Sequence, residues 1–434
     1  ESDALGSCAL KANTTGCRNV AIGKSAMSTN TEGECNVAVG HTALSANTTG
    51  DFNTALGVKA LNTNTTAANN TAVGFISLTA NTTGTQNTAI GADALKTNTT
   101  GDDNTALGFC ALRSNTTASD NTALGRKSLQ SNTEGGSNTA VGLNALFTNI
   151  TGGCNVAVGV SALETSTTSN NTAVGFETLK DTTTGFGTAV GYRAMKANTT
   201  SSGSTAMGYQ AMCANTTGSN NTAFGLETLS KNTTGADNTA VGRDALEVNT
   251  TGCRNTAVGF EAGKANTTGV ENTFIGRKAG LGATTTDNLT AIGSFALSAA
   301  VTGANNTAVG KSALAANTSG SENVAIGSFA GDSNTTASGN VFIGKEAGQA
   351  NTTANGNTAI GQNTFDANTT GVSNVAVGNA SLGANTIGCR NVAVGHEAMN
   401  SNTEGNCNTA VGRKALVINT TGDKNTAFGH TALG

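Results

Sequence analysis

The sequence predicts an all-β fold, a parallel β-solenoid built from stacked coils of 17 residues. The main observation is one repeat that returns every 17 residues from Ser2 to the end of the chain, Asn-Thr-Ala-(Val/Ile/Leu)-Gly-x-x-Ala-Leu-x-x-Asn-Thr-Thr-Gly-x-x. The second is a glycine at the fifth position of every coil, as a sharp bend at a fixed place requires. The third is composition, because Thr, Val, Ile, Asn and Gly replace helix formers, and Pro and Trp are absent.

We number the positions of each coil from 1 to 17, starting at the first asparagine of the repeat. Coils then begin at Asn19, at Asn36 and at regular steps down to a partial coil at Asn425. Two coils, which together span 155–186, have only 16 residues each. No linker or change of composition interrupts the pattern, so we expect a single continuous solenoid of about 25 coils over 1–434. Each coil is expected to contain two short strands and two tight turns.

Positions 3 and 9 are predicted to share a narrow core. Position 3 is Ala in every coil except two, where it is Phe274 or Phe342. Position 9 is usually Leu or Met, but it is glycine in those two coils and in the coil before each, at Gly263, Gly280, Gly331 and Gly348. A large ring therefore occurs only where the opposing side chains are missing, as a constant interior volume requires.

Position 4 is apolar in every coil, from Leu5 and Ile22 to Phe428. Because side chains alternate along a strand, position 4 is expected to point outward if position 3 points inward. A continuous apolar ladder on the outside of a monomer would promote aggregation, so we expect a homo-oligomer that buries it. The alternative is that the bend at position 5 turns position 4 inward.

Residues 36–40 and 323–327 read Asn-Val-Ala-Val-Gly and Asn-Val-Ala-Ile-Gly. They resemble the Asn-Ser-Val-Ala-Ile-Gly signature of the head repeats of trimeric autotransporter adhesins, and related β-roll repeats of phage and bacterial tail-fibre-like proteins. The resemblance covers essentially the whole chain, and repetition gives it specificity. It implies a left-handed β-roll, three chains side by side, and display on a surface for attachment. The 17-residue coil is longer than the coil of those heads, because of its extra Asn-Thr-Thr-Gly turn.

The Asn-Thr-Thr element of most coils has two interpretations. It is an acceptor pattern for N-glycosylation, with candidates at Asn13, Asn47, Asn64, Asn81 and Asn98. It also fits a turn in which the asparagine caps its own backbone and stacks on the asparagines of adjacent coils, and this interpretation is the one we favour.

Nine cysteines are present, and four of them form two similarly spaced pairs. Cys17 and Cys35 lie one coil and one residue apart, as do Cys389 and Cys407. That offset corresponds to a Cα separation of roughly 6 Å, which a disulfide accepts. Two such disulfides would resist fraying at the two ends, where solenoids are weakest. No cysteine or histidine spacing suggests a zinc site.

Position 6 is variable, and aromatic residues there alternate with Lys, Arg and His. The candidate outward contacts are Phe75, Phe109, Phe176, Tyr192, Tyr209 and Phe260. Such rings could stack on sugars or pack against another filament, or they are ordinary exposed variability. The three histidines also occupy position 6, without a carboxylate or nucleophile at a fixed offset. We therefore expect no catalysis, no cofactor and no metal ion.

The net charge of −4 and the lack of a basic stripe argue against nucleic acid as a partner. No stretch of about 18 apolar residues is present, so this segment is not expected to insert into a membrane. We expect an extracellular structural fibre, adhesive shaft or head on a cell or virion surface. Its partner would be itself, as a homotrimer or an end-to-end filament, with surface glycans or a host receptor as further ligands. The alternatives are a self-assembling surface filament subunit, a viral receptor-binding tail fibre, and an ice-binding protein that uses its threonine ladders.

Overall fold

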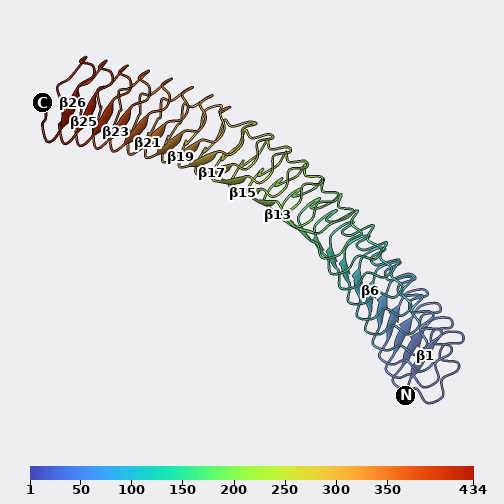
Figure 1. Ribbon diagram of the computed structural model, residues 1–434. Coiled ribbons are helices and arrows are strands. Elements are labelled where there is room, and N and C mark those ends of the chain that lie inside the picture. The colour runs from blue at the N-terminus through green and yellow to red at the C-terminus, as the bar shows by residue number, and fades with distance from the viewer. The chain divides into compact units, whose positions relative to one another are not determined.

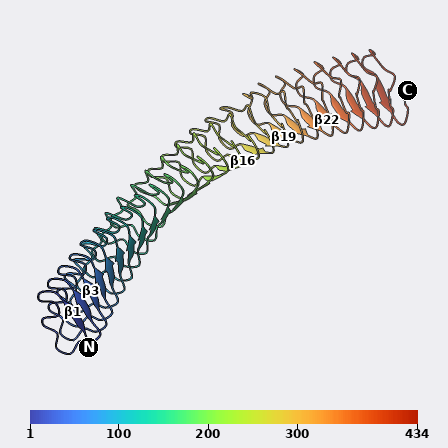
Figure 2. The same cartoon turned by 180° about the vertical axis from the view of Figure 1, so that it is seen from behind.

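The computed structural model describes residues 1–434 and contains strands and turns but no helix. It divides into two compact units, Glu1–Thr217 and Gly218–Gly434. Each unit is a parallel β-solenoid of stacked coils (Figure 1), and the same stacking is visible from behind (Figure 2). The predicted fold class is therefore confirmed. No helix of the length and hydrophobicity needed to cross a membrane is present.

Each coil contributes one strand. The strands of the first unit are β1 (Asp3–Leu5), β2 (Val20–Ile22), β3 (Val37–Val39), β4 (Thr54–Leu56), β5 (Thr71–Val73), β6 (Thr88–Ile90), β7 (Thr105–Leu107), β8 (Thr122–Leu124), β9 (Thr139–Val141), β10 (Val156–Val158), β11 (Thr172–Val174), β12 (Gly187–Val190) and β13 (Ser204–Met207). Those of the second unit are β14 (Thr222–Phe224), β15 (Thr239–Val241), β16 (Thr256–Val258), β17 (Thr273–Ile275), β18 (Thr290–Ile292), β19 (Thr307–Val309), β20 (Val324–Ile326), β21 (Val341–Ile343), β22 (Thr358–Ile360), β23 (Val375–Val377), β24 (Val392–Val394), β25 (Thr409–Val411) and β26 (Thr426–Phe428).

The expectation of two strands per coil is wrong, because only positions 2 to 4 form a strand, together with position 1 in β12 and β13. The strand ends at the glycine of position 5, such as Gly23, whose φ is +129°. Two later residues of the same coil, Ser25 and Met27, have φ values of 57° and 49°. Left-handed residues interrupt an extended chain, so the rest of the coil is a series of turns.

Close stacking of the coils explains why position 5 is always glycine. A Cβ added to Gly23 would lie 2.6 Å from the carbonyl oxygen of Gly40, the same position in the next coil. No side chain fits at that distance, and the positive φ disfavours L-residues in addition. The periodic glycine therefore sets how closely one coil can follow another.

Neighbouring strands within each unit pair in parallel and without a shift of register. Ala21 lies opposite Ala38, for example, and the Val20 N–H donates to the Asn36 carbonyl oxygen at 2.8 Å. The two short coils keep this register, since Val156 pairs with Thr172 and Thr172 with Thr188. The missing residue is therefore removed from the turns and not from the sheet.

The interior of each coil is narrow and consists of small and aliphatic side chains. Ala21 and Met27, at positions 3 and 9, are both 0% exposed, as predicted. Ala26, at position 8, is also fully buried. The paired glycines lie where expected, because a Cβ on Gly331 would approach Cδ2 of Phe342 to 2.7 Å. The two phenylalanines thus occupy space that leucines fill in other coils.

Candidate interaction surface

The outer face of the strands carries the apolar ladder of position 4. Ile22, Leu56 and Leu107 are 40%, 46% and 41% exposed, whereas the intervening position-3 alanines are fully buried. The prediction that position 4 points outward is therefore confirmed, and the inward alternative is wrong. We call the side chains at positions 2 and 4 of the strands in each unit the strand face.

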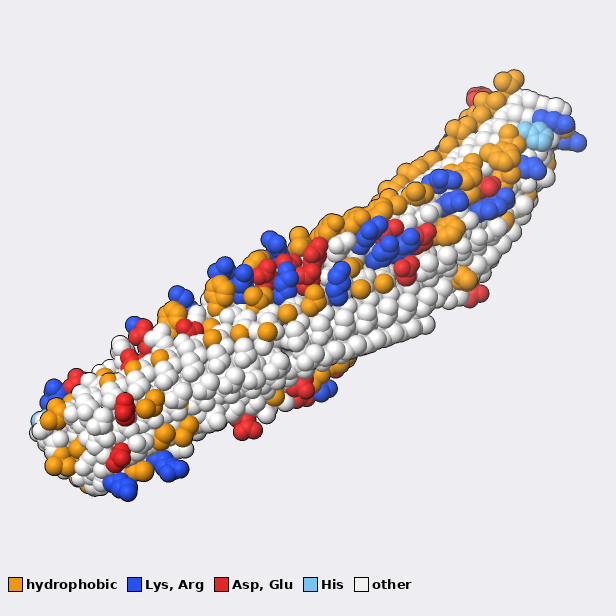
Figure 3. All heavy atoms as spheres, turned by 90° about the horizontal axis from the view of Figure 1, so that it is seen from above, with side chains coloured by type: hydrophobic (Ala, Val, Ile, Leu, Met, Phe, Trp, Pro, Cys, Tyr) orange, Lys and Arg blue, Asp and Glu red, His pale blue; other side chains and the backbone are white.

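The strand face also carries a column of threonines at position 2. Six successive coils have threonine there, from Thr54 to Thr139, and their strands pair in register. Strand backbone groups are used in bonds between coils, so this face offers mainly apolar side chains and hydroxyl groups. Asp3 is its one charged residue. Figure 3 shows hydrophobic side chains in a row along the coils, beside a band where charged side chains gather.

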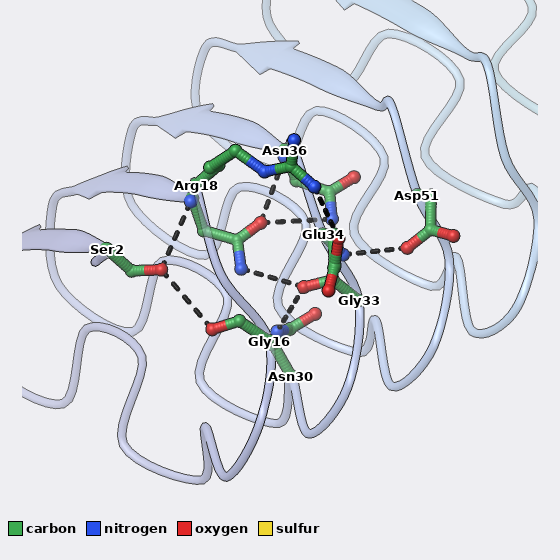
Figure 4. Close-up of polar contacts among 9 residues, drawn as sticks. Ser2, Gly16, Arg18, Asn30, Gly33, Glu34, Asn36 and Asp51 are labelled. Carbon is green, nitrogen blue, oxygen red and sulfur yellow. Dashed lines mark hydrogen bonds and ion pairs between the residues drawn. The ribbon is translucent and has the colours of Figure 1, made fainter.

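The position-12 asparagines form an amide ladder inside the turn. Asn30 Nδ2 donates to the Gly33 carbonyl oxygen at 3.1 Å (Figure 4). It also donates to Asn13 Oδ1 in the preceding coil at 2.8 Å. Asn47 Nδ2 repeats the pattern toward Gly50 and Asn30. The favoured interpretation, a turn asparagine stacked between coils, describes this geometry.

Burial bears directly on the glycosylation candidates. Asn47, Asn64, Asn81 and Asn98 are each 0% exposed, and both N–H groups of each side-chain amide are donated within the protein. Asn13, in the first coil, is partly exposed and donates only to Gly16. A glycan on Nδ2 would displace one of these bonds and would need space that the turn does not contain. The folded coil therefore does not present the four buried amides to a modifying enzyme.

The two predicted cysteine pairs lie on adjacent turns, as expected. The Cys35 N–H donates to the Cys17 carbonyl oxygen at 3.1 Å, and the Cys407 N–H to the Cys389 carbonyl oxygen at 3.0 Å. The structure has these four residues as free thiols, so neither disulfide is formed in it. Arg18 and Glu34 form an ion pair at 2.8 Å beside the first pair (Figure 4). The disulfides remain a prediction for the oxidised protein.

The position-6 aromatics lie at the surface, but three of them contact one another. Phe75, Phe109 and Tyr209 are 55%, 49% and 48% exposed. The ring centroids of Phe176 and Tyr192 are 5.4 Å apart, and those of Tyr192 and Tyr209 are 5.0 Å apart, with nearly parallel planes. The rings of this stack cover each other's faces, which a sugar would otherwise use. Phe260 lies beneath the Arg243 guanidinium, which is 5.3 Å from its ring centroid. Phe75 and Phe109 are the candidates whose rings contact neither another ring nor a cation.

An ion network borders the aromatic stack. Arg193 lies 5.0 Å from the Tyr192 ring centroid and contacts Glu177 at 2.8 Å. Lys196 contacts the same carboxylate at 2.9 Å and Lys180 at 3.5 Å. The hydrogen bond from Lys196 is the main cause that lowers the pKa of Glu177 to about 2, with Arg193 adding to it and burial opposing it. The coil of Glu177 and Lys180 has Thr182 in place of the turn asparagine, whereas the coil of Arg193 and Lys196 keeps Asn198, so the network links a coil that lacks part of the amide ladder to one that has it.

Two of the three histidines contact charged neighbours at the surface. His430 contacts Arg413 at 3.0 Å, and His396 lies 3.9 Å from Glu397. No three His, Cys, Asp or Glu side chains come together in a way that could hold a metal ion.

No protein-family model and no curated protein matches the chain. The strand face recurs in every coil and is the candidate interaction surface.

Proposed function

We propose that this chain is a non-catalytic structural shaft whose strand face packs against copies of itself. The exposed apolar ladder at position 4 is the observation that supports this most. At roughly 50 Å² per side chain, the thirteen coils of one unit would present more apolar area than the roughly 300–600 Å² of the largest patch on a typical monomer. Association would remove this area from water, which is favourable in proportion to the area buried.

The composition of the strand face suits packing between identical chains. It is almost free of charge, so copies can meet without burying an unpaired ion. A closed assembly of parallel chains would place the same coil of each chain at one level and hide the ladder along its length. We propose a trimer, displayed outside the cell or on a virion for attachment. The resemblance to adhesin heads and the high cysteine count favour that assembly and location.

A filament of stacked chains is the alternative assembly. The end strands β1 and β26 each pair on one side only, which leaves backbone groups free to add another strand. Such a filament would grow without a fixed size, and its growth would not depend on the strand face.

Light scattering on matched variants tests the proposal. In Leu56→Lys/Leu107→Lys, two side chains of the strand face gain charge. In the control, Val58→Lys/Phe109→Lys, two residues at position 6 of the same coils change, and they are similarly exposed at 41% and 49%. We expect the parent and control to have about three times the chain mass of 42.7 kDa, and the strand-face variant to have the mass of a single chain.

Other outcomes contradict the proposal in different ways. A parent protein of 42.7 kDa would show that the strand face does not drive assembly. An open-ended mass distribution that both variants retain would favour the end-to-end filament. Circular dichroism spectra that match the parent would confirm that the variants are folded.

Ice binding is a second candidate function, and the position-2 threonines favour it. Their column lies beside aliphatic side chains on a regular parallel sheet, which is a suitable array for ordering water. Against it, position 4 alternates irregularly among Val, Ile, Leu, Met and Phe, so the surface is uneven. Thermal hysteresis of the purified chain, lost in Thr88→Lys/Thr105→Lys, would support this function. Its absence in the parent would exclude it.

A further inference from the structure

One coil of the second unit carries a notch in its side wall. Positions 7 and 10 form this wall, as ion pairs between Lys264 and Glu261 and between Lys264 and Glu247 show. In the coil that begins at Asn374, these positions are Ala380 and Gly383, the smallest pair in the unit. The missing side chains leave an open cavity of about 510 Å³ between the two adjacent coils.

Two side-chain oxygen atoms that accept hydrogen bonds face the notch. A Cβ on Gly383 would lie 2.5 Å from Asn400 Oδ1 and 3.5 Å from Asp366 Oδ1, so both oxygens face the same space. Asn363 also lines the notch, and its Oδ1 is enclosed within the protein without a hydrogen-bond partner. Two acceptors, one of them on a carboxylate, therefore face one cavity.

Asp366 also differs from most other acidic residues of this wall, because it has no cationic partner. Asp244 and Glu247 both pair with Lys264, and Glu397 pairs with Lys414. Burial raises the pKa of Asp366, and the nearby charge of Glu346 adds to this effect. A carboxylate without a counterion beside an open cavity would gain stability from a cation placed there.

We propose that this notch binds a primary ammonium group of a small molecule. An ammonium has three N–H donors and no acceptor, so it can donate to both of these oxygens, and its charge balances Asp366. The Ser401 hydroxyl and the methyl groups of Ala367 and Ala384 also line the cavity, so it offers polar and apolar contacts. An amino sugar and an aliphatic amine both supply this chemistry.

Titration calorimetry on the full chain tests the proposal. The probes are glucosamine, butylamine, N-acetylglucosamine and calcium chloride. We expect glucosamine or butylamine to bind with a dissociation constant on the order of 1 mM, and N-acetylglucosamine not to bind. Binding of both amines would identify the ammonium alone as the determinant, whereas binding of glucosamine only would identify an amino-sugar site.

Two variants and a matched control locate the site. Asp366→Asn removes the charge without changing the shape, and Gly383→Gln fills the notch with the residue found at position 10 of another coil, Gln349. Each should weaken amine binding at least tenfold. The control is Asp332→Asn, because Asp332 also occupies position 10 and its pKa is also raised by burial, but it does not line the notch. Binding by this control should be unchanged.

Several results would overturn the proposal. These are failure of both amines to bind at tens of millimolar, equal binding of N-acetylglucosamine, and equal loss in Asp332→Asn. Calcium that binds alone and displaces the amine would make the notch a metal site instead. If Gly383→Gln fails to fold, Asp366→Asn still decides the question, because it preserves side-chain volume.

Discussion

The ring of Phe274 occupies the space in which a side chain at Gly280 would lie. A Cβ built on Gly280 would collide with Cδ1 and Cε1 of this ring, and one on Gly263 in the preceding coil would collide with its other edge. Three positions in two coils therefore share one volume. The same arrangement recurs at Phe342, with Gly331 and Gly348.

This shared volume predicts strong coupling between substitutions. Phe274→Ala should leave a cavity and lower the free energy of unfolding by about 3–5 kcal/mol. Gly263→Leu/Gly280→Leu should overfill the core and destabilise it by about 1–3 kcal/mol or more. The triple variant restores the Ala and Leu of other coils and should recover most of the loss. Urea unfolding measures all three, and additive losses in the triple variant would contradict the shared volume.

The amide ladder predicts a large effect from an isosteric change. Asn81 Nδ2 donates to the Gly84 carbonyl oxygen at 2.8 Å and to Asn64 Oδ1 at 3.0 Å. Asn81→Asp would place carboxylate oxygens against both acceptors, inside a site that is fully buried. We expect a loss of about 3 kcal/mol or more, because a charge is buried without a partner.

The control for this prediction is Asn355→Asp. Asn355 is exposed, and its Oδ1 only accepts a hydrogen bond, from the Ser338 N–H at 2.7 Å. Asp51 accepts the same bond at the equivalent position of another coil. The free energy of unfolding of the control should therefore lie within about 0.5 kcal/mol of that of the parent. Equal effects at the two sites would show that the ladder contributes little.

The same ladder predicts the outcome of expression in a glycosylating host. Asn47, Asn64, Asn81 and Asn98 are enclosed, so we expect folded, secreted protein to carry no N-glycan at these four sites. Peptide mass spectrometry checks each site separately. Asn13 lacks a ladder partner before it and serves as an internal comparison. Glycans at the four buried sites in protein with native circular dichroism would contradict the turn geometry.

The cysteine pairs predict redox-dependent stability at the ends of the chain. In protein isolated under oxidising conditions, peptide mapping should identify Cys17 linked to Cys35 and Cys389 linked to Cys407. Replacing Cys17 or Cys389 with Ser should speed amide hydrogen exchange in the terminal coils and leave central coils unchanged. Mapping that finds only free thiols at these four residues would contradict the pairing.

The sequence predicts the structure correctly where the repeat itself shows which positions of the coil must fit together. The glycines opposite Phe274 identify positions 3 and 9 as one core, and alternation then directs Ile22 outward. The expectation of a second strand failed at Ser25 and Met27, which have left-handed φ values. Such values are rare for these residue types, so local conformational preferences do not predict them. Stacking between coils imposes that conformation, so a second strand does not form.

The notch illustrates a second limit of the sequence. The sequence shows that Ala380 and Gly383 are small. It does not show that they form a cavity with Asp366 and Asn400, which lie one coil away on either side. The 17-residue register brings them together, although no local motif marks them. Comparing the same position across coils, and not along the chain, is the signal that could have located this cavity.

The network at Glu177 predicts a specific loss of stability in acid. Its pKa is lowered from 4.5 to about 2 in the folded state, mainly by the hydrogen bond from Lys196. Its contribution is therefore complete above about pH 4.5 and is lost as the pH falls toward 2. Glu177→Gln should destabilise the coils around the aromatic stack near pH 7, and the difference from the parent should shrink near pH 2. Hydrogen exchange of 171–203 measures this locally.

Glu134→Gln is the control, because Glu134 is exposed and forms no ion pair, so its effect should be small at both pH values. A difference for Glu177→Gln that stays constant from neutral to acid would show that the ion pairs do not stabilise these coils.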